Sequence, residues 1–152
     1  MNFSLEWHVI KSKTDINDLL NVFGSFHDGC LKELKYISGE FVDHSLSMNP
    51  INTKRCLSVI FQRQYHDPSV IEIIFDPIIR LNLAPVSEDY TGEILGAYMD
   101  FVDGVIYWSD DENFEPSKKD EYNDCTWISS ASAKWRIADE YLGEGEIYIT
   151  RE

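Results

Sequence analysis

Apolar and polar residues alternate along most of the chain, and this alternation predicts short β-strands. Three segments show it clearly: "FSLEWHV" (3–9), "RCLSVIFQRQY" (55–65) and "IEIIF" (71–75). Because successive side chains of a strand point to opposite faces, each segment would bury one face on a core. The residues expected on the buried faces are Phe3, Leu5, Trp7, Val9, Leu57, Val59, Phe61, Ile71, Ile73 and Phe75.

Turn-forming residues predict how the strands connect. The Asp76-Pro77 step suggests that 70–75 and 78–84 are neighbouring antiparallel strands joined by a short turn. Asp103-Gly104 predicts a hairpin, because Asp-Gly readily adopts the positive φ angles of a type I′ turn. A further strand is expected in "CTWISSASAKWRIA" (125–138). One face would carry Cys125, Trp127, Ala131, Ala133, Trp135 and Ile137, and the other Thr126, Lys134 and Arg136.

One segment has the period of a helix instead. In "TDINDLLNVFG" (14–24) the apolar residues recur at the spacing i, i+3, i+4 and i+7, which gives one apolar stripe. Thr14 or Asp15 can cap the start of this helix, and Gly24 suits a left-handed residue just after its end. The residues of the stripe are Ile16, Leu19, Leu20 and Phe23.

These elements predict a fold of the α+β class. The 152 residues favour a single domain (1–152), mainly of antiparallel β-structure. We expect a curved sheet or a sandwich of about eight or nine strands, with the short N-terminal helix packed on it. The absence of a β-α-β rhythm removes the crevice in which parallel sheets usually bind nucleotides.

The charge of the chain restricts its partners. Thirteen basic and twenty-seven acidic residues give a formal net charge of −14, which repels nucleic-acid phosphates and anionic lipid headgroups. We therefore expect neither nucleic acid nor a membrane as a partner. The excess lies in the second half, because residues 1–80 carry 8 bases and 10 acids, whereas residues 81–152 carry 5 and 17.

The cysteines and the N-terminus favour a cytoplasmic protein. Cys30, Cys56 and Cys125 are odd in number and widely spaced, so they indicate neither a disulfide framework nor a thiolate zinc site. No stretch has the length and purity of a membrane span, and the first eleven residues lack the pattern of a signal peptide.

The densest acidic run, residues 103–124, contains eight acids and two lysines and is interleaved with aromatic residues. Carboxylates steer a basic protein partner, and aromatic rings supply buried area in the complex, so this run is a candidate docking surface. The same composition also fits a solvated loop at the edge of an ordinary core. The candidate binding residues are Asp110, Asp111, Glu112, Glu115, Trp108, Phe114 and Tyr122.

A second candidate is the segment "GSFHDGC" (24–30), which follows the predicted helix. His27 and Asp28 are residue types that bind metals or act as a base with its orienting partner. The alternative is a structural turn, in which Phe26 fills the core and Asp28 accepts backbone N–H bonds. Arg63 would lie near the core and is expected to pair with an acid, for which Asp28 is one candidate. We expect no metal site and no cofactor.

Four segments carry a resemblance: "FHDGCLKEL", "IFQRQ", "IEIIFD" and "WISSASAKWR". Together they resemble small uncharacterised proteins of Gram-positive bacteria that have an F-H-D turn after a short helix and a W-R strand near the end. More loosely, an acidic single domain with F-H-D at this place resembles bacterial toxin immunity proteins. The resemblance implies no catalytic residue.

The leading functional hypothesis is a non-enzymatic binding protein that docks on a basic protein partner through its acidic, aromatic second half. An immunity protein that neutralises a toxin is one form of it. Two alternatives stay open: a small metal-dependent hydrolase that uses His27 and Asp28, and a β-sandwich that binds a small ligand or assembles with itself.

Overall fold

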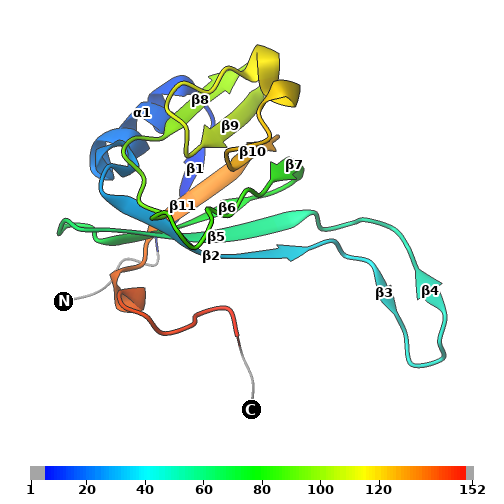
Figure 1. Ribbon diagram of the computed structural model, residues 1–152. Helices are drawn as coiled ribbons and strands as arrows, with labels where there is room; N and C mark the ends of the chain where they lie inside the picture. The colour runs from blue at the N-terminus through cyan, green and yellow to red at the C-terminus, as the bar shows by residue number, and fades with distance from the viewer. Residues whose placement is uncertain (1–5, 150–152) are drawn as a thin grey trace.

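The computed structural model describes residues 6–149 and shows a mainly antiparallel β-fold with one α-helix, which confirms the predicted α+β class (Figure 1). Eleven strands occur in this range, more than the eight or nine expected from the sequence. They are β1 (His8–Ile10), β2 (Gly29–Ile37), β3 (Phe41–Val42), β4 (Met48–Asn49), β5 (Cys56–Arg63), β6 (Val70–Phe75), β7 (Ile78–Asn82), β8 (Tyr98–Val102), β9 (Val105–Ser109), β10 (Trp127–Ser130) and β11 (Ala133–Ile137). The helices are α1 (Lys13–Val22) and the short 3₁₀ turns η1 (Gly24–Phe26), η2 (Pro116–Glu121) and η3 (Asp139–Tyr141).

Two sheets enclose the core, and two long, bent strands pass from one sheet into the other. The five-stranded sheet has the order β1-β11-β6-β5-β2, and the four-stranded sheet has the order β7-β10-β9-β8. β6 continues into β7 and β10 continues into β11, and the two continuous segments pair with each other on both sides of the bend. Strands that change sheet through such bends form the corners of orthogonally packed β-sheets.

The corner overturns two predictions from the sequence. β6 and β7 are not paired neighbours, because the Asp76-Pro77 step carries the chain into the other sheet instead of reversing it. The expected single strand 125–138 is likewise divided into β10 and β11. The carbonyl oxygens of Pro77 and Ser132 accept the Ala131 and Asp76 amides, each at 3.0 Å, so the backbone groups at the bend are paired. The Ser130 hydroxyl lies 2.8 Å from the Pro77 oxygen and 2.6 Å from the Ser132 oxygen, and its single proton is shared between them.

The core lies between the two sheets, and alternation predicted much of it. The inward residues of β5 and β6 are fully buried as expected: Leu57, Val59, Phe61, Ile71, Ile73 and Phe75. The prediction for the first strand is wrong at Val9, which is 47% exposed, whereas Ile10 is buried. Register explains the difference, because Ile10 lies opposite the buried Ala133 of β11 and Val9 opposite Lys134. Phe3 and Leu5 of the same prediction lie outside the described residues.

The helix α1 presents its apolar stripe to the core. Ile16, Leu19 and Phe23 are fully buried. The cap is Ser12 rather than Thr14 or Asp15: its hydroxyl accepts the Asp15 amide at 3.3 Å, and the Asp15 carboxylate accepts the Lys11 amide at 2.8 Å. The helix ends as predicted, since Gly24 has a φ of +57°. In the described part of the chain, no helix meets the length and hydropathy that a bilayer crossing requires.

The β8–β9 hairpin forms at the predicted turn. Val102 lies opposite Val105, and the two residues between them, Asp103 and Gly104, have φ angles of 52° and 77°. Both angles are positive, as a type I′ turn requires.

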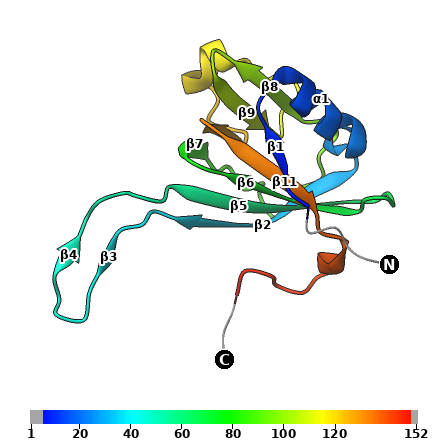
Figure 2. The same cartoon turned by 180° about the vertical axis from the view of Figure 1, so that it is seen from behind.

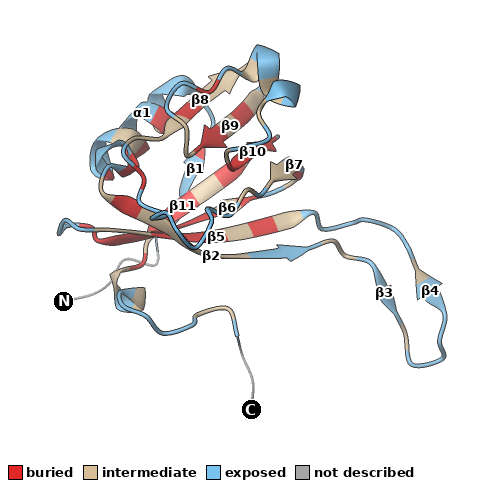
Figure 3. Ribbon diagram, in the orientation of Figure 1, coloured by how far each residue is buried: buried red, intermediate tan, exposed pale blue. Residues whose placement is uncertain are grey.

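Residues 38–54 form an arm that projects from the end of the β2–β5 pair (Figures 1 and 2). Its strands β3 and β4 pair only with each other and form a separate two-stranded sheet. Figure 3 shows that most of the arm is exposed, in contrast to the buried strands of the body. The sequence did not predict this arm.

Replacing Phe61 with alanine is expected to lower the free energy of unfolding by about 3 to 5 kcal/mol, because it leaves a cavity between the sheets. The Phe61 ring lies 4.9 Å from the rings of both Phe26 and Trp108. Urea unfolding followed by tryptophan fluorescence measures the change. Leu95→Ala is the control, because Leu95 is 72% exposed. Equal losses in the two variants would contradict this account of the core.

Candidate functional site

Three segments that are distant in sequence meet beside the end of α1: the turn 24–29, the segment 91–97 and the residues that follow β9. Backbone hydrogen bonds join the first two. The Asp28 amide donates to the Ile94 carbonyl at 3.0 Å, the Ile94 amide to Gly29 at 2.7 Å and the Ala97 amide to Ser25 at 3.0 Å. Four side chains at this junction form what we call the acidic site: His27, Asp28, Glu93 and Glu112.

The local sequence fixes the turn through one ring and one glycine. Phe26 has a φ of +65° and is fully buried, so its ring enters the core while His27 and Asp28 stay at the surface. A Cβ atom on Gly29 would lie 2.8 Å from the Phe26 carbonyl oxygen and 2.9 Å from that of Gln62. Only glycine fits this close approach of two backbones.

His27 is held by one carbonyl and surrounded by carboxylates. Its Nδ1 lies 2.6 Å from the Leu95 carbonyl oxygen, and its Nε2 lies 3.4 Å from the Asp28 carboxylate. The hydrogen bond to Leu95 is the main cause that raises the pKa of His27 above 6.5, and the negative charges of Asp28, Glu93 and Glu112 raise it further. The acidic site therefore already stabilises one positive charge.

Asp28 does not pair with Arg63, and among the described residues its carboxylate accepts none of the backbone amides expected of it. Its carboxylate accepts the Tyr65 hydroxyl at 3.3 Å and lies beside His27. Within residues 6–149, no carboxylate oxygen lies within 4 Å of the Arg63 guanidinium group. The predicted acidic partner of Arg63 is therefore wrong for the described chain.

Arg63 binds carbonyl oxygens instead. Its guanidinium group donates to Pro68 at 2.8 Å and to Val22 at 3.2 Å, and it lies 4.9 Å above the Phe23 ring. Val22 ends α1, where carbonyl groups lack partners within the helix, so Arg63 stabilises the helix end. Partial burial lowers the pKa of Arg63. Arg63 therefore has a structural role, because its guanidinium group holds backbone carbonyl groups in place.

A metal ion at His27 and Asp28 would need further ligands from nearby side chains. Three or more histidine, cysteine, aspartate or glutamate side chains do not gather at a potential metal site anywhere in residues 6–149. One nitrogen of His27 is already engaged by the Leu95 carbonyl oxygen.

Glu93 lines two cavities. One, of about 460 Å³, is lined by Asp28, Arg63, Glu93 and Leu142, among others. The other, of about 330 Å³, has a largely apolar wall from Leu31 and residues 83–86, and its polar groups include Glu93, Asp110 and Thr126. Asp110 accepts the Thr126 amide at 3.1 Å. Burial raises the pKa of this carboxyl group, and the negative charge of Asp111 raises it further.

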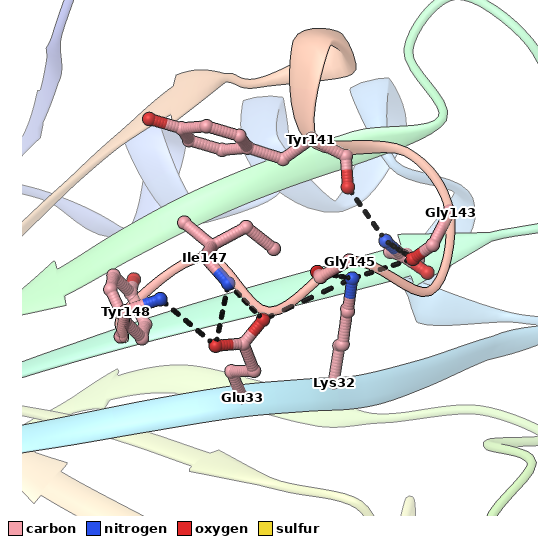
Figure 4. A network of polar contacts seen from close by, with 8 residues as sticks. Lys32, Glu33, Tyr141, Gly143, Gly145, Ile147 and Tyr148 are labelled. Carbon is pink, nitrogen blue, oxygen red and sulfur yellow. Dashed lines mark hydrogen bonds and ion pairs between the residues drawn. The ribbon is translucent and has the colours of Figure 1, made fainter. Parts of the chain in front are cut away.

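A C-terminal strap, residues 139–149, crosses the outer face of the five-stranded sheet and supplies Leu142 to the larger cavity (Figure 4). Side chains of the sheet hold its backbone. The Glu33 carboxylate accepts the Ile147 amide at 2.9 Å and the Tyr148 amide at 3.0 Å, and Lys32 donates to the carbonyl oxygens of Gly143 and Gly145. Gln62 donates to Gly143 at 3.0 Å.

An ionic network lies beneath the strap. Arg136, predicted on the opposite face from Trp135, is only 7% exposed, and its guanidinium group contacts Glu72 at 2.9 Å and Glu140 at 2.8 Å. The Tyr148 hydroxyl donates to Glu72 at 2.6 Å. Burial, followed by this bond to Glu72, raises the pKa of Tyr148. The strap thus covers charges that would otherwise face solvent.

The structure divides the predicted docking residues into interior rings and surface acids. Trp108 and Phe114 are buried. The Phe114 ring lies 4.9 Å from that of Tyr122 and 5.5 Å from that of Trp127, so it belongs to an aromatic cluster. Tyr122 is half-buried, and its hydroxyl donates to Asn113 at 3.1 Å.

The acidic residues of the same run differ in their exposure and in their contacts. Asp111 is half-buried and accepts the Asn113 amide at 2.9 Å. Glu115 is exposed and lies 3.4 Å from Lys118. Glu112 is exposed, and its carboxylate lies so close to Gly96 that a Cβ there would be 2.6 Å away. Glu112 therefore lies where the acidic run meets the segments around His27. Glu115 instead forms a local ion pair with Lys118.

Sequence reasoning missed Glu93, Lys32, Glu33 and the strap. Glu93 lies in a segment without regular alternation, and its position depends on the pairing of Gly29 with Ile94. Scans of the chain against models of protein families, curated proteins and solved structures find no match.

Neutralising the carboxylates of the acidic site is expected to lower the pKa of His27. NMR titration of the imidazole should give a pKa above 6.5 in the unchanged protein and a lower one in Asp28→Asn. Because the folded-state pKa is raised, the stability that His27 contributes is fully present below the unfolded-state pKa. It is lost as the pH rises through the folded-state pKa. A pKa that does not change in Asp28→Asn would contradict the proposed geometry.

Glu33→Gln is expected to loosen the strap, because the neutral amide loses the negative charge that strengthens both hydrogen bonds and replaces one acceptor oxygen with an NH₂ group. We expect faster hydrogen exchange at the Ile147 and Tyr148 amides and a loss of about 1 to 3 kcal/mol of unfolding free energy. Glu144→Gln, at an exposed position in the strap, is the control. Unchanged exchange at 147 and 148 in the Glu33 variant would show that this carboxylate does not hold the strap.

Proposed function

We propose that this chain is a non-enzymatic binding protein and that its acidic site docks on a basic protein partner. The observation that carries the proposal is the placement of Asp28, Glu93 and Glu112, from three separate segments, where the negative charge of each raises the pKa of His27. Asp28 and Glu93 also line the same cavity, and the Glu112 carboxylate lies beside Gly96 of the neighbouring segment. Such a surface accelerates encounter with a positively charged partner.

The smaller cavity supplies a place for a lysine or arginine side chain of that partner. Its apolar wall, which includes Leu83 and Val86, suits the aliphatic stem of such a side chain. Glu93 and Asp110 supply carboxylates for the charged head. The larger cavity suits a cation less well, because Arg63 lines it.

The proposal gives the aromatic rings a smaller role in binding than the hypothesis drawn from the sequence did. Because Trp108 and Phe114 are buried in the body, charge rather than exposed rings would supply most of the recognition. Interactions between surface charges are screened by salt, so the complex should be strongly salt-sensitive. The narrower form, an immunity protein that occludes a toxin, rests only on the resemblance of the sequence.

The proposal is tested by comparing two triple variants as bait in a lysate of the source cells. Asp28→Asn, Glu93→Gln and Glu112→Gln together remove the acidic site, and Asp18→Asn, Glu144→Gln and Glu146→Gln remove the same charge from exposed positions elsewhere. We expect the unchanged protein and the second variant to retain a basic protein at low salt, and the first variant to lose it. High salt should release the captured protein.

Two results would contradict the proposal. One is capture of the same protein by both triple variants, which would show that only total charge matters. The other is the absence of any salt-sensitive basic protein from the material bound to the unchanged bait.

A further inference from the structure

Residues 36–51, which comprise the end of β2 and most of the arm (residues 38–54), expose more large apolar side chains than any stretch of similar length in the described chain. Seven of the seventeen exposed large hydrophobic residues lie between positions 36 and 51. Leu46 at the tip is 85% exposed and Ile51 is 69% exposed. These residues are Tyr36, Ile37, Phe41, Val42, Leu46, Met48 and Ile51. Apolar patches of this kind on a protein surface mark interaction sites.

The arm has a defined shape, although it has no core of its own. At its base, the Lys54 and Arg55 amides donate to the Ser38 carbonyl at 2.9 and 3.2 Å. At its tip, Asp43 Oδ1 accepts the Ser45 amide at 3.0 Å and the Ser47 amide at 3.0 Å. A two-stranded ribbon alone is only marginally stable in water, so a partner that covers its apolar side chains would stabilise it.

Charge identifies the kind of partner. The arm, residues 38–54, contains two acids, Glu40 and Asp43, and one base, Lys54, so it has a formal charge of −1. The remaining −13 of the net charge of −14 lies elsewhere in the chain. A basic protein would prefer the acidic body to this nearly neutral arm. Two copies of the chain, by contrast, can meet through the arm with the least repulsion.

The projection of the arm also keeps two acidic bodies apart. Eight extended residues span roughly 25 Å, whereas electrostatic repulsion is screened over about 8 Å at physiological salt. In Figures 1 and 2 the arm extends well away from both sheets. A contact between arms would therefore place most of the repelling charge beyond the screening length.

We propose that the arm pairs with the same arm of a second copy of this chain. β3 is the edge that pairs, because Pro50 directly follows β4 and cannot donate a backbone hydrogen bond on that side. Antiparallel pairing of β3 with its own copy obeys a twofold axis, the symmetry of most dimers. The contact buries Phe41 and Val42, and it brings Leu46 of each tip towards the partner arm.

Analytical ultracentrifugation of the full chain over a range of concentrations tests this assignment. We expect the unchanged protein to reach twice the chain mass of 17.6 kDa. The double variant Phe41→Glu and Leu46→Glu should stay at the mass of one chain, with an apparent dissociation constant raised at least about tenfold. Ile79→Glu, at a body position that is 56% exposed, should dimerise as the unchanged protein does. A cooperative urea transition in each variant would show that it folds, because loss of the dimer lowers the midpoint without abolishing the transition.

Three results would overturn the proposal. The unchanged protein could remain a single chain at every concentration, or the double variant could dimerise as strongly as the unchanged chain. A single chain that floats with zwitterionic phosphatidylcholine vesicles, and loses this in the double variant, would assign the arm to a lipid surface. The capture experiment on the acidic site uses other residues, so either proposal can fail alone.

Discussion

Burial of the Phe26 ring between the two sheets is the constraint on which the acidic site depends. The ring contacts Phe61 of one sheet and Trp108 of the other, so it fastens the end of α1 to both. With Phe26 directed inward, the residues that follow it must turn outward, and segment 91–97 pairs with the backbone at that point. The geometry of the acidic site therefore depends on the packing of the Phe26 ring in the core.

Period-two alternation predicted the buried faces of β5 and β6, because both strands keep one face on a single core along their whole length. It failed where a chain segment changes sheets. Segment 125–138 alternates except at Ile128 and Ser129, but Ala131 and Ser132 lie at the corner, and the strand there divides into two. The alternation of apolar and polar residues does not indicate which sheet the second half of segment 125–138 joins.

The site was less predictable than the fold, for a related reason. His27, Asp28 and Glu112 were recognised as candidates because of their residue types. Their proximity arises from long-range pairing, and Glu93 enters only through the bridge between Gly29 and Ile94. The aromatic residues near Glu112 were misplaced because interleaving with acids does not distinguish a buried ring from an exposed one. Phe114 shows this, since its neighbours in sequence are polar while its ring packs on Trp127.

The strap is held through both its main chain and its side chains. Lys32, Glu33 and Gln62 contact its amide and carbonyl groups, which most residue types present. The side chains of Asp139, Glu140 and Tyr148 add bonds to the body, and Tyr141 and Ile147 pack against Ile60 and Val70.

The two kinds of attachment differ in what they demand of the sequence. Exposed strap positions such as Glu144 and Glu146 can accept many residue types, because only their backbone is needed. Positions 139, 140 and 148 cannot, because their side chains complete the polar network beneath the strap.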